Sequence, residues 1–316
     1  MVVREGEVLR RIGKMAELFD DHSPLQLQSS GSWNGKAFTL IGRLQYQYGE
    51  GTWTEWHALL ADGSNATLGE DNGAYVFSMP LALGREVPPA ASLRVGATTA
   101  FNGKSYAVAS NQQVALIAAQ GELPHLPGIG HPFALVELRS QSAELRDAGA
   151  VLSIDYGRSP PEVSEGVAVR LEDLKLSGLR DESFKNEKGR QFNCPQCGAT
   201  LNLQFATTQS ATCGSCNSLI DVSQGIGGEL RHAVQDEPIQ PLIALGSTGT
   251  LQGAQWQVVG YQHRMGYEPM DPDEHFGWDE YLLFNAKRGF TFLVDSTDGW
   301  SVVKPATGAP VVSSNA

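Results

Sequence analysis

Four cysteines arranged as two CxxC pairs constrain this sequence more than any other feature. The pairs are CPQC at residues 194–197 and CGSC at residues 213–216, and the chain has no other cysteine. Each short loop lets two thiolates converge on one metal ion, and two such loops complete a closed tetrahedral site. The sequence therefore predicts a zinc ribbon over residues 190–222, with a structural Zn²⁺ ion held by Cys194, Cys197, Cys213 and Cys216. Two disulfide bonds are the competing interpretation for a secreted chain.

Composition narrows the class of protein. A chain of 316 residues is expected to form two or three folding units, and its formal charge of -12 disfavours nucleic acid and anionic membrane surfaces as partners. The N-terminus lacks the apolar run of a signal peptide, and no stretch approaches the length of a transmembrane helix. We therefore expect a cytoplasmic protein in which the thiols stay reduced.

The first 22 residues show apolar side chains at helix-like spacing. Val8, Ile12, Met15, Leu18 and Phe19 recur among charged residues, so we predict an amphipathic N-terminal helix over residues 1–22. Packing of this helix on the body of the protein is the favoured interpretation. Peripheral membrane association through the helix is the alternative.

Beyond residue 22 the pattern becomes one of short strands separated by tight turns. Asn34-Gly35 is typical of a type I′ hairpin, and further turns are expected at Asp62-Gly63 and Asn72-Gly73. We predict a small antiparallel β-meander or barrel module over residues 23–84 and a separate middle β domain over residues 85–180.

The first module recurs near the other end of the chain. The segment GAQWQVVG at residues 253–260 corresponds to GKAFTLIG at residues 35–42, and WDEY at residues 278–281 corresponds to WTEW at residues 53–56. A weaker echo begins at Asn102-Gly103. The fold is therefore expected to be mainly β, with a second module over residues 242–304 and a flexible tail over residues 305–316.

Several blocks of the first module resemble a bacterial family catalogued as a domain of unknown function, DUF4178. These blocks are FDDHSPL at residues 19–25, IGRLQY at residues 41–46 and WTEW at residues 53–56. The second module is similar to the same domain, so two copies would flank the ribbon. The resemblance implies no activity or catalytic residue, although members tend to be encoded beside polyamine-synthase-like and membrane-stress proteins.

The duplicated WxE motif places a carboxylate among aromatic rings, an environment that can raise its pKa or bind a cation. On a strand, Trp53 and Glu55 would share one face and Trp56 would take the other. A folding motif is the competing interpretation. The candidate ligand-binding residues are Trp53, Glu55, Trp56, Trp278, Glu280 and Tyr281.

Motifs for covalent catalysis and phosphate binding are absent from the sequence. There is no GxSxG elbow, no spare cysteine and no GxxxxGK loop, which favours a protein without enzymatic activity and leaves that question open. The first interpretation is an assembly or adaptor protein that binds protein partners. The alternative is a binding protein or enzyme for a cationic, polyamine-like small molecule, with Glu55 and Glu280 as charge partners.

Overall fold

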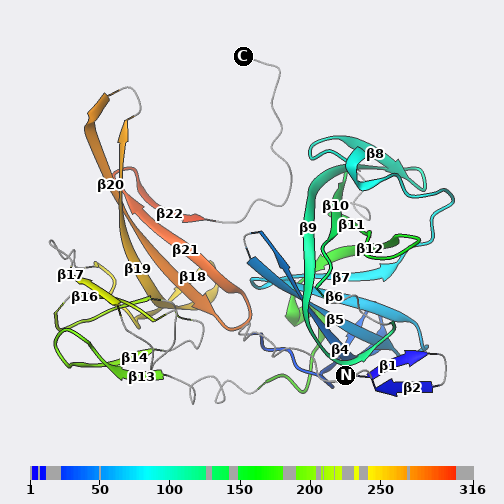
Figure 1. Ribbon diagram of the computed structural model, residues 1–316, viewed down its shortest axis with the longest axis horizontal. Coiled ribbons are helices and arrows are strands. Elements are labelled where there is room, and N and C mark those ends of the chain that lie inside the picture. Colours follow the sequence, from blue (N-terminus) through cyan, green and yellow to red (C-terminus); the bar gives the residue numbers. More distant parts are fainter. Residues whose placement is uncertain are drawn as a thin grey trace. The chain divides into compact units, whose positions relative to one another are not determined.

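The protein is described here from a computed structural model (Figure 1). It describes residues 2–5, 8–11, 23–49, 51–125, 130–141, 149–180, 190–203, 208, 210–216, 218–222, 231–234, 241–268 and 271–303. Side chains are described for these residues except 2–5, 8–11, 190, 231–234, 268 and 272–274. The chain divides into two compact units, built mainly on Leu25–Leu179 and Arg180–Lys304.

The described residues form strands and two short 3₁₀ turns, as the mainly β prediction required. In the first unit the turns are η1 (Ala90–Ser92) and η2 (Leu171–Leu174). Its strands are β1 (Val2–Glu5), β2 (Val8–Arg11), β3 (Ser30–Trp33), β4 (Lys36–Tyr48), β5 (Gly51–Leu60), β6 (Asn65–Asp71), β7 (Ala74–Pro80), β8 (Thr98–Phe101), β9 (Lys104–Leu123), β10 (Phe133–Ser140), β11 (Ala150–Asp155) and β12 (Glu162–Val169).

Eight strands of the first unit close into a barrel. Their order is β9-β10-β11-β12-β7-β6-β5-β4, and β4 pairs back onto β9. The closing pairs join strands that are far apart in the chain, β7 with β12 and β4 with β9. The predicted module 23–84 and middle domain 85–180 therefore do not fold as separate units. Each supplies four strands to one barrel.

Gly42 and Gly121 allow the barrel to close where β4 crosses β9. The two residues are paired, and a Cβ atom on Gly42 would lie 2.0 Å from the carbonyl oxygen of Glu122. Gly121 has a φ of 77° and would place a Cβ atom 2.3 Å from the carbonyl oxygen of Ile41. Any side chain at either position would force the two backbones apart.

The helix predicted over residues 1–22 is wrong for the residues that the structure describes. Val2–Glu5 and Val8–Arg11 are antiparallel strands, and β1 also pairs in parallel with the end of β9. A short isolated helix is only marginally stable in water, whereas pairing with β9 ties this segment to the barrel. Residues 12–22 and the predicted flexible tail 305–316 lie outside the described residues.

The chain contains three copies of one structural repeat, which we call repeat 1 (residues 25–80), repeat 2 (93–169) and repeat 3 (243–303). Each begins with a short strand, a two-residue turn and a long strand. The turns are Asn34-Gly35, Asn102-Gly103 and Gln252-Gly253, and all six residues have positive φ. The Asn-Gly prediction is therefore confirmed at Asn34-Gly35, and the weak echo at Asn102-Gly103 is the start of a full repeat.

Local hydrogen bonds confirm that the three repeats correspond residue by residue. The amide N–H of Leu40 donates to Ser29, that of Val108 to Ala97 and that of Val258 to Ser247, each at 2.9 Å. A bulge follows each of these positions in the long strand. From this register, Trp53, Glu55 and Trp56 correspond to Phe133, Leu135 and Val136 in repeat 2, which explains why the echo lacks the WxE motif.

The outer face of the barrel, and not its lumen, carries the two large apolar clusters. Leu40, Trp56, Leu68 and Phe77 of repeat 1 are covered by leucines from residues 25–27 and 171–179. The corresponding residues of repeat 2 form a separate cluster covered by Leu81, Leu83 and Leu93. Full burial of a side chain such as Phe77 contributes roughly 1.5–3 kcal/mol to stability.

The second unit contains the cysteine region and repeat 3 as separate sheets. Around the cysteines, β13 (Arg190–Asn193) pairs with β14 (Thr200–Leu203), and β15 (Ser210–Thr212) pairs with β16 (Ser218–Asp221). A further strand, β17 (Arg231–Val234), pairs with β16. The ribbon thus includes a strand beyond the predicted end at residue 222.

Repeat 3 is an open five-stranded antiparallel sheet, ordered β18-β19-β20-β21-β22. Its strands are β18 (Thr248–Leu251), β19 (Ala254–Glu268), β20 (Asp271–Asn285), β21 (Gly289–Ser296) and β22 (Gly299–Val303). It has the strands of one half of the barrel. A small core of Val258, Tyr281 and Leu283 lies on the face that corresponds to the outer face of the barrel.

Candidate functional site

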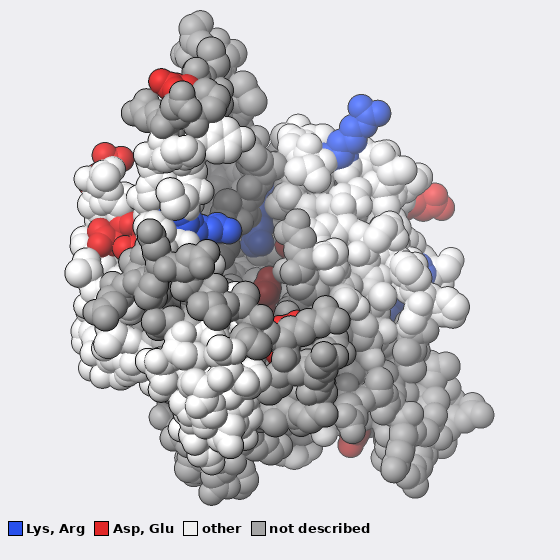
Figure 2. Space-filling model, turned by 60° about the vertical axis from the view of Figure 1, so that its left-hand side comes forward, with Lys and Arg blue, Asp and Glu red and all other residues white. Residues whose placement is uncertain are grey.

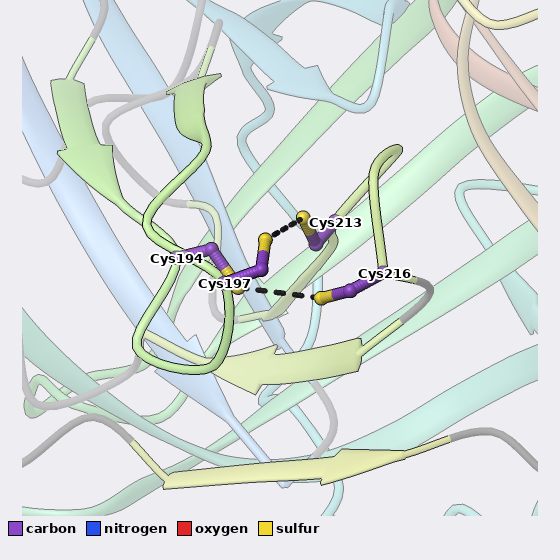
Figure 3. A group of neighbouring side chains, drawn as sticks. All are labelled: Cys194, Cys197, Cys213 and Cys216. Carbon is purple, nitrogen blue, oxygen red and sulfur yellow. Dashed lines mark hydrogen bonds between the residues drawn. The ribbon is translucent and has the colours of Figure 1, made fainter.

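The four cysteines come together at one point between the two pairs of ribbon strands (Figure 3). The sulfur atoms of Cys194 and Cys216 are 3.6 Å apart, as are those of Cys197 and Cys213. All four sulfurs lie within 4.8 Å of one another. A disulfide bond would need about 2.05 Å, so the thiols are free.

The sulfur spacing fits a tetrahedral metal ion. Metal–sulfur bonds of about 2.3 Å in a tetrahedron place the sulfurs roughly 3.8 Å apart. The two CxxC loops share one backbone geometry, because the amide of Cys194 donates to Ala199 and that of Cys213 donates to Ser218, at 2.8 and 2.9 Å. The region around the cysteines can therefore hold one metal ion.

Hydrogen bonds favour the thiolate form at Cys213 and Cys216, whereas the neighbouring thiols raise the pKa of Cys197. The Oγ atom of Ser218 lies 3.3 Å from the sulfur of Cys216, and this contact lowers the pKa of Cys216 to about 6. Backbone amides of Ser215 and Cys216 lower the pKa of Cys213. Four sulfur ligands around one ion would leave no coordination position for a substrate, as in structural metal sites.

A second candidate site lies in the lumen of the barrel. Burial is the main cause that raises the pKa of Glu55 to about 7, and the charges of Asp155, Glu137 and Glu162 raise it further. Glu55 is on β5 and Asp155 is on β11, four strands away around the eight-stranded barrel. Charges on opposite walls interact across the barrel only when both side chains point inward, so these carboxylates share the lumen.

Strand register places further residues on the same inner face. Directly opposed residues of antiparallel strands point to one side of the sheet, so Tyr46 and Trp53 lie beside Glu55. Their rings stack with centroids 4.9 Å apart, and Phe133 meets Tyr46 edge-on at 6.1 Å. The lumen therefore has an aromatic wall as well as carboxylates.

The inner face combines a buried apolar cluster, which includes Leu44, Tyr46 and Leu116, with polar and small residues. Glu55, Trp53 and Asp155 keep part of their surface accessible, whereas the outward-facing Thr54 and Trp56 are buried. Small residues occupy much of the remaining wall. By register these are Gly69, Ser78, Ser153, Ser164 and Gly166. An eight-stranded barrel has an interior that side chains can fill or that can hold one small ligand.

The lumen holds more negative charge than its arginines neutralise. Arg158 pairs with Glu162 at 2.8 Å, and Arg139 lies 3.6 Å from Glu137. Glu55 accepts a hydrogen bond from the indole of Trp53 at 3.4 Å and has no cationic partner among the residues that the structure describes. Burial also raises the pKa of Asp155, because no counter-charge fully offsets the loss of water.

His57 adds a neutral hydrogen-bonding group to the inner face. Burial, together with the charge of Arg158, lowers its pKa to about 4, so the ring is uncharged at pH 7. Its Nε2 atom is buried and lacks a hydrogen-bond partner within the described part of the chain. The side chain lines a pocket of about 650 Å³ at the end of the barrel, together with Thr39 and Glu122.

The two copies of the WxE motif are in different environments. Trp53 and Glu55 lie on one face and Trp56 on the other, where its indole donates to Glu70 at 3.0 Å and its ring stacks on Arg43. Trp56 is thus a core residue, and alternation along the strand predicted this arrangement correctly. Tyr281, its counterpart, is likewise fully buried.

Glu280, unlike Glu55, has a hydrogen bond to each carboxylate oxygen and an arginine close by. Trp278 donates to it at 2.7 Å, Gln262 donates to its other oxygen, and Arg264 lies 3.6 Å away. Burial alone would raise the pKa of Glu280, but these three contacts outweigh it and lower the pKa. The two glutamates therefore differ in environment, and their pKa values shift in opposite directions.

Of the lumen residues, the sequence pattern indicated only Trp53 and Glu55 as candidates for ligand binding. Glu137, Asp155, Glu162 and His57 lie on four strands that no local motif connects. The one available signal is that Glu137 and Asp155 are the polar members of segments in β10 and β11 where apolar and polar side chains alternate. Without the closed barrel, that signal does not show that the residues meet.

The fold and the sites define a class of protein: a repeated β-barrel protein whose sequence carries, between the barrel strands and a half-barrel, four cysteines that can hold a metal ion. A family model described as "Domain of unknown function (DUF4178)" matches residues 26–171 and 244–313. The chain belongs to this family. The first match spans repeats 1 and 2, and the second covers repeat 3. A search of curated proteins and a search of solved structures found no match.

Two features of the described residues bear on membranes and nucleic acids as partners. In the described residues no helix has the length and apolar character that crossing a bilayer requires. On the face drawn in Figure 2, Lys and Arg side chains of the described residues are scattered among uncharged ones. Among the described residues on that face there is no dense basic patch of the kind that binds a nucleic-acid backbone.

Proposed function

We propose that the closed barrel binds a small organic cation, with Glu55 and Asp155 as its charge partners. The observation that carries this proposal is the set of carboxylates that face one another across the lumen without enough arginine to neutralise them. A bound cation would relieve their mutual repulsion and lower the raised pKa of Glu55. The aromatic wall of Tyr46, Trp53 and Phe133 suits the alkyl chain and charge of an amine.

The spacing of the carboxylates favours an extended amine over a metal ion. In the described part of the chain, the four cysteines form the one group of three or more His, Cys, Asp or Glu residues with ligand atoms close enough to hold an ion. The lumen carboxylates are spread over β5, β10, β11 and β12. A linear polyamine carries several charges along one chain. The Nε2 atom of His57, which has no hydrogen-bond partner among the described residues, can accept a hydrogen bond from an amine N–H.

Calorimetric titration with spermidine tests this proposal. We expect binding at one site per chain, and Glu55→Gln should weaken it at least tenfold because a charge partner is lost. Glu280→Gln is the matched control, since it changes the same motif in repeat 3. Affinity should rise up to about tenfold from pH 6 to pH 8 as Glu55 ionises around pH 7. Absence of binding heat, or an equal loss in both variants, would contradict the proposal.

For the metal centre we propose a structural Zn²⁺ ion. Four thiolates in two CxxC loops form a donor set that zinc prefers, and free thiols are maintained in a reducing compartment such as the cytoplasm. The ion would fix the two pairs of ribbon strands to each other, since the core around it is a small cluster that includes Phe192, Leu203 and Ile220.

A second candidate function is assembly with other proteins. The open sheet of repeat 3 supports it, because a sheet edge can accept a strand from another chain. This function is compatible with ligand binding in the barrel, because the two use different repeats.

A further inference from the structure

The lumen holds a second pair of carboxylates beside the pair that the proposed site uses. We call Glu55 and Asp155 the first pair, and Asp71 and Glu137 the second pair. Leu68 belongs to the outer cluster of repeat 1, so alternation places Asp71, three residues later on β6, on the inner face. Val136 and Leu138 belong to the outer cluster of repeat 2, so Glu137 between them on β10 also faces inward. β6 and β10 are four strands apart in the barrel of eight, on opposite walls.

Electrostatic interaction confirms that the second pair faces across the lumen. Burial is the main cause that raises the pKa of Glu137, Arg139 lowers it, and the charge of Asp71 raises it further. Burial also raises the pKa of Asp71 itself. Arg139 lies 3.6 Å from Glu137 and can offset one of the two negative charges. The second pair therefore attracts a further cation when both of its members are ionised.

The two pairs are displaced from each other by the same step on both walls. Gly69 on β6 is opposite Glu55, and Asp71 comes two positions later. On β10 the residue opposite Asp155 is Leu135, and the member of the second pair again comes two positions later. β6 and β10 run in the same direction, because an even number of antiparallel pairings separates them. The second pair thus lies farther along the barrel, about 7–8 Å from the first, which is the spacing of diagonal neighbours on a sheet.

The second pair lies toward one end of the barrel, where solvent reaches it. Asp71 is the last residue of β6, next to the turn at Asn72-Gly73, and it is exposed. The side chain of Glu137 is 40% accessible. A ligand that enters from this end would meet the second pair before it reaches the first.

His57 provides a separate indication that the lumen takes a ligand. On β5 it lies two residues from Glu55, on the side away from Asp71. Burial, with the charge of Arg158 after β11 on the opposite wall, lowers the pKa of His57, as expected for a ring that points into the lumen. The residue is 8% exposed, and its Nε2 atom has no hydrogen-bond partner among the residues that the structure describes. Buried polar atoms are rarely left unpaired, so this atom suits a hydrogen-bonding group of a ligand.

We propose that the ligand carries two ammonium groups on one alkyl chain and lies along the barrel, with one group at the first pair and the other at the second pair. This inference rests on the proposed binding of an organic cation, and it adds that a single charge is not enough for tight binding. A chain of four or five carbon atoms places two ammonium nitrogens roughly 6–7.5 Å apart, close to the spacing of the pairs. The stacked rings of Tyr46 and Trp53 offer the alkyl chain an apolar surface.

NMR titration of the full chain with 1,5-diaminopentane and with pentylamine tests the inference, since the two amines differ by one ammonium group. At pH 8, where Glu55 is mostly ionised, the diamine should bind at least about tenfold more tightly. Asp71→Asn should weaken the diamine about tenfold and leave pentylamine within about twofold, whereas Glu55→Gln should weaken both. Asp173→Asn is the control, because it removes an exposed carboxylate that lies 3.5 Å from Arg170 on the surface.

The possible results separate this inference from the proposed function. Equal affinity for the two amines, or an Asp71→Asn variant that binds the diamine like the wild type, would overturn the inference and leave cation binding in place. If neither amine nor spermidine binds, the proposed function fails and the inference fails with it. Glu137→Gln, on the opposite wall, should have the same selective effect as Asp71→Asn, so the test does not depend on one variant. Circular dichroism of each variant should match the wild type, which shows that weaker binding is not loss of the fold.

Discussion

Replacing Cys213 by serine should release the metal ion and unfold the ribbon. The sulfur of Cys213 lies 3.6 Å from that of Cys197 and is buried, so the remaining three thiolates cannot enclose an ion. Structural zinc sites contribute on the order of 10 kcal/mol of binding free energy that is also folding free energy. The expected results are a fall in bound metal from one ion per chain to almost none and a loss of amide protection across residues 190–222.

The ribbon experiment has a control in the same loop. Ser215→Ala removes an exposed hydroxyl but keeps the backbone amide that supports Cys213, so it should retain the metal. Metal content by mass spectrometry and hydrogen exchange of the ribbon peptides give the two measurements. The barrel should stay protected in both variants because its clusters do not include ribbon residues. Full metal content in Cys213→Ser would contradict a four-cysteine site.

Gly42→Ala should destabilise the closed barrel by about 2–4 kcal/mol, the range expected for a side chain forced into a backbone contact. The new Cβ atom would lie 2.0 Å from the carbonyl oxygen of Glu122, at the crossing of β4 and β9. That distance requires the two backbones to separate, which weakens the pairing that closes the barrel. The expected result is faster hydrogen exchange in the peptides of β4 and β9.

Gly260→Ala is the matched control, because Gly260 occupies the same position in repeat 3. Its Cβ atom would lie 3.2 Å from Cβ of Leu282, a contact that a small shift can relieve. The difference between the two variants measures the effect of closure, since the substitution and the local strand are the same. An equally small loss of stability in both variants would contradict the close approach of the β4 and β9 backbones at Gly42.

The sequence predicted the features that depend on neighbouring residues. CxxC spacing predicted that the four cysteines converge, Asn34-Gly35 predicted a hairpin with positive φ, and alternation predicted the separation of Trp53 and Glu55 from Trp56. Each of these is set within a few residues of the chain. The amphipathic pattern of residues 1–22 was misleading because a short apolar pattern does not distinguish a helix from strands that find partners in a distant segment.

The barrel and its lumen could not be predicted because they depend on pairing between distant strands. Closure joins β4 to β9 and β7 to β12, and no local motif marks either pair. Repeat 2 has Phe133, Leu135 and Val136 at the positions of Trp53, Glu55 and Trp56, so its correspondence to repeat 1 rests on turns, bulges and hydrogen bonds. The lumen carboxylates Glu137 and Asp155 became a candidate site only when the barrel placed them opposite Glu55.

The most direct test of the central claim is the titration of the Glu55 carboxyl group by NMR, with and without saturating spermidine. We expect a midpoint of about 7 in the free protein, and a fall of at least about one unit when the amine binds, because the cation favours the charged form. The carboxyl group of Glu280, already held by Trp278, Gln262 and Arg264, serves as an internal reference whose midpoint should not change. A Glu55 midpoint near the ordinary value that spermidine leaves unchanged would contradict a cation site in the lumen.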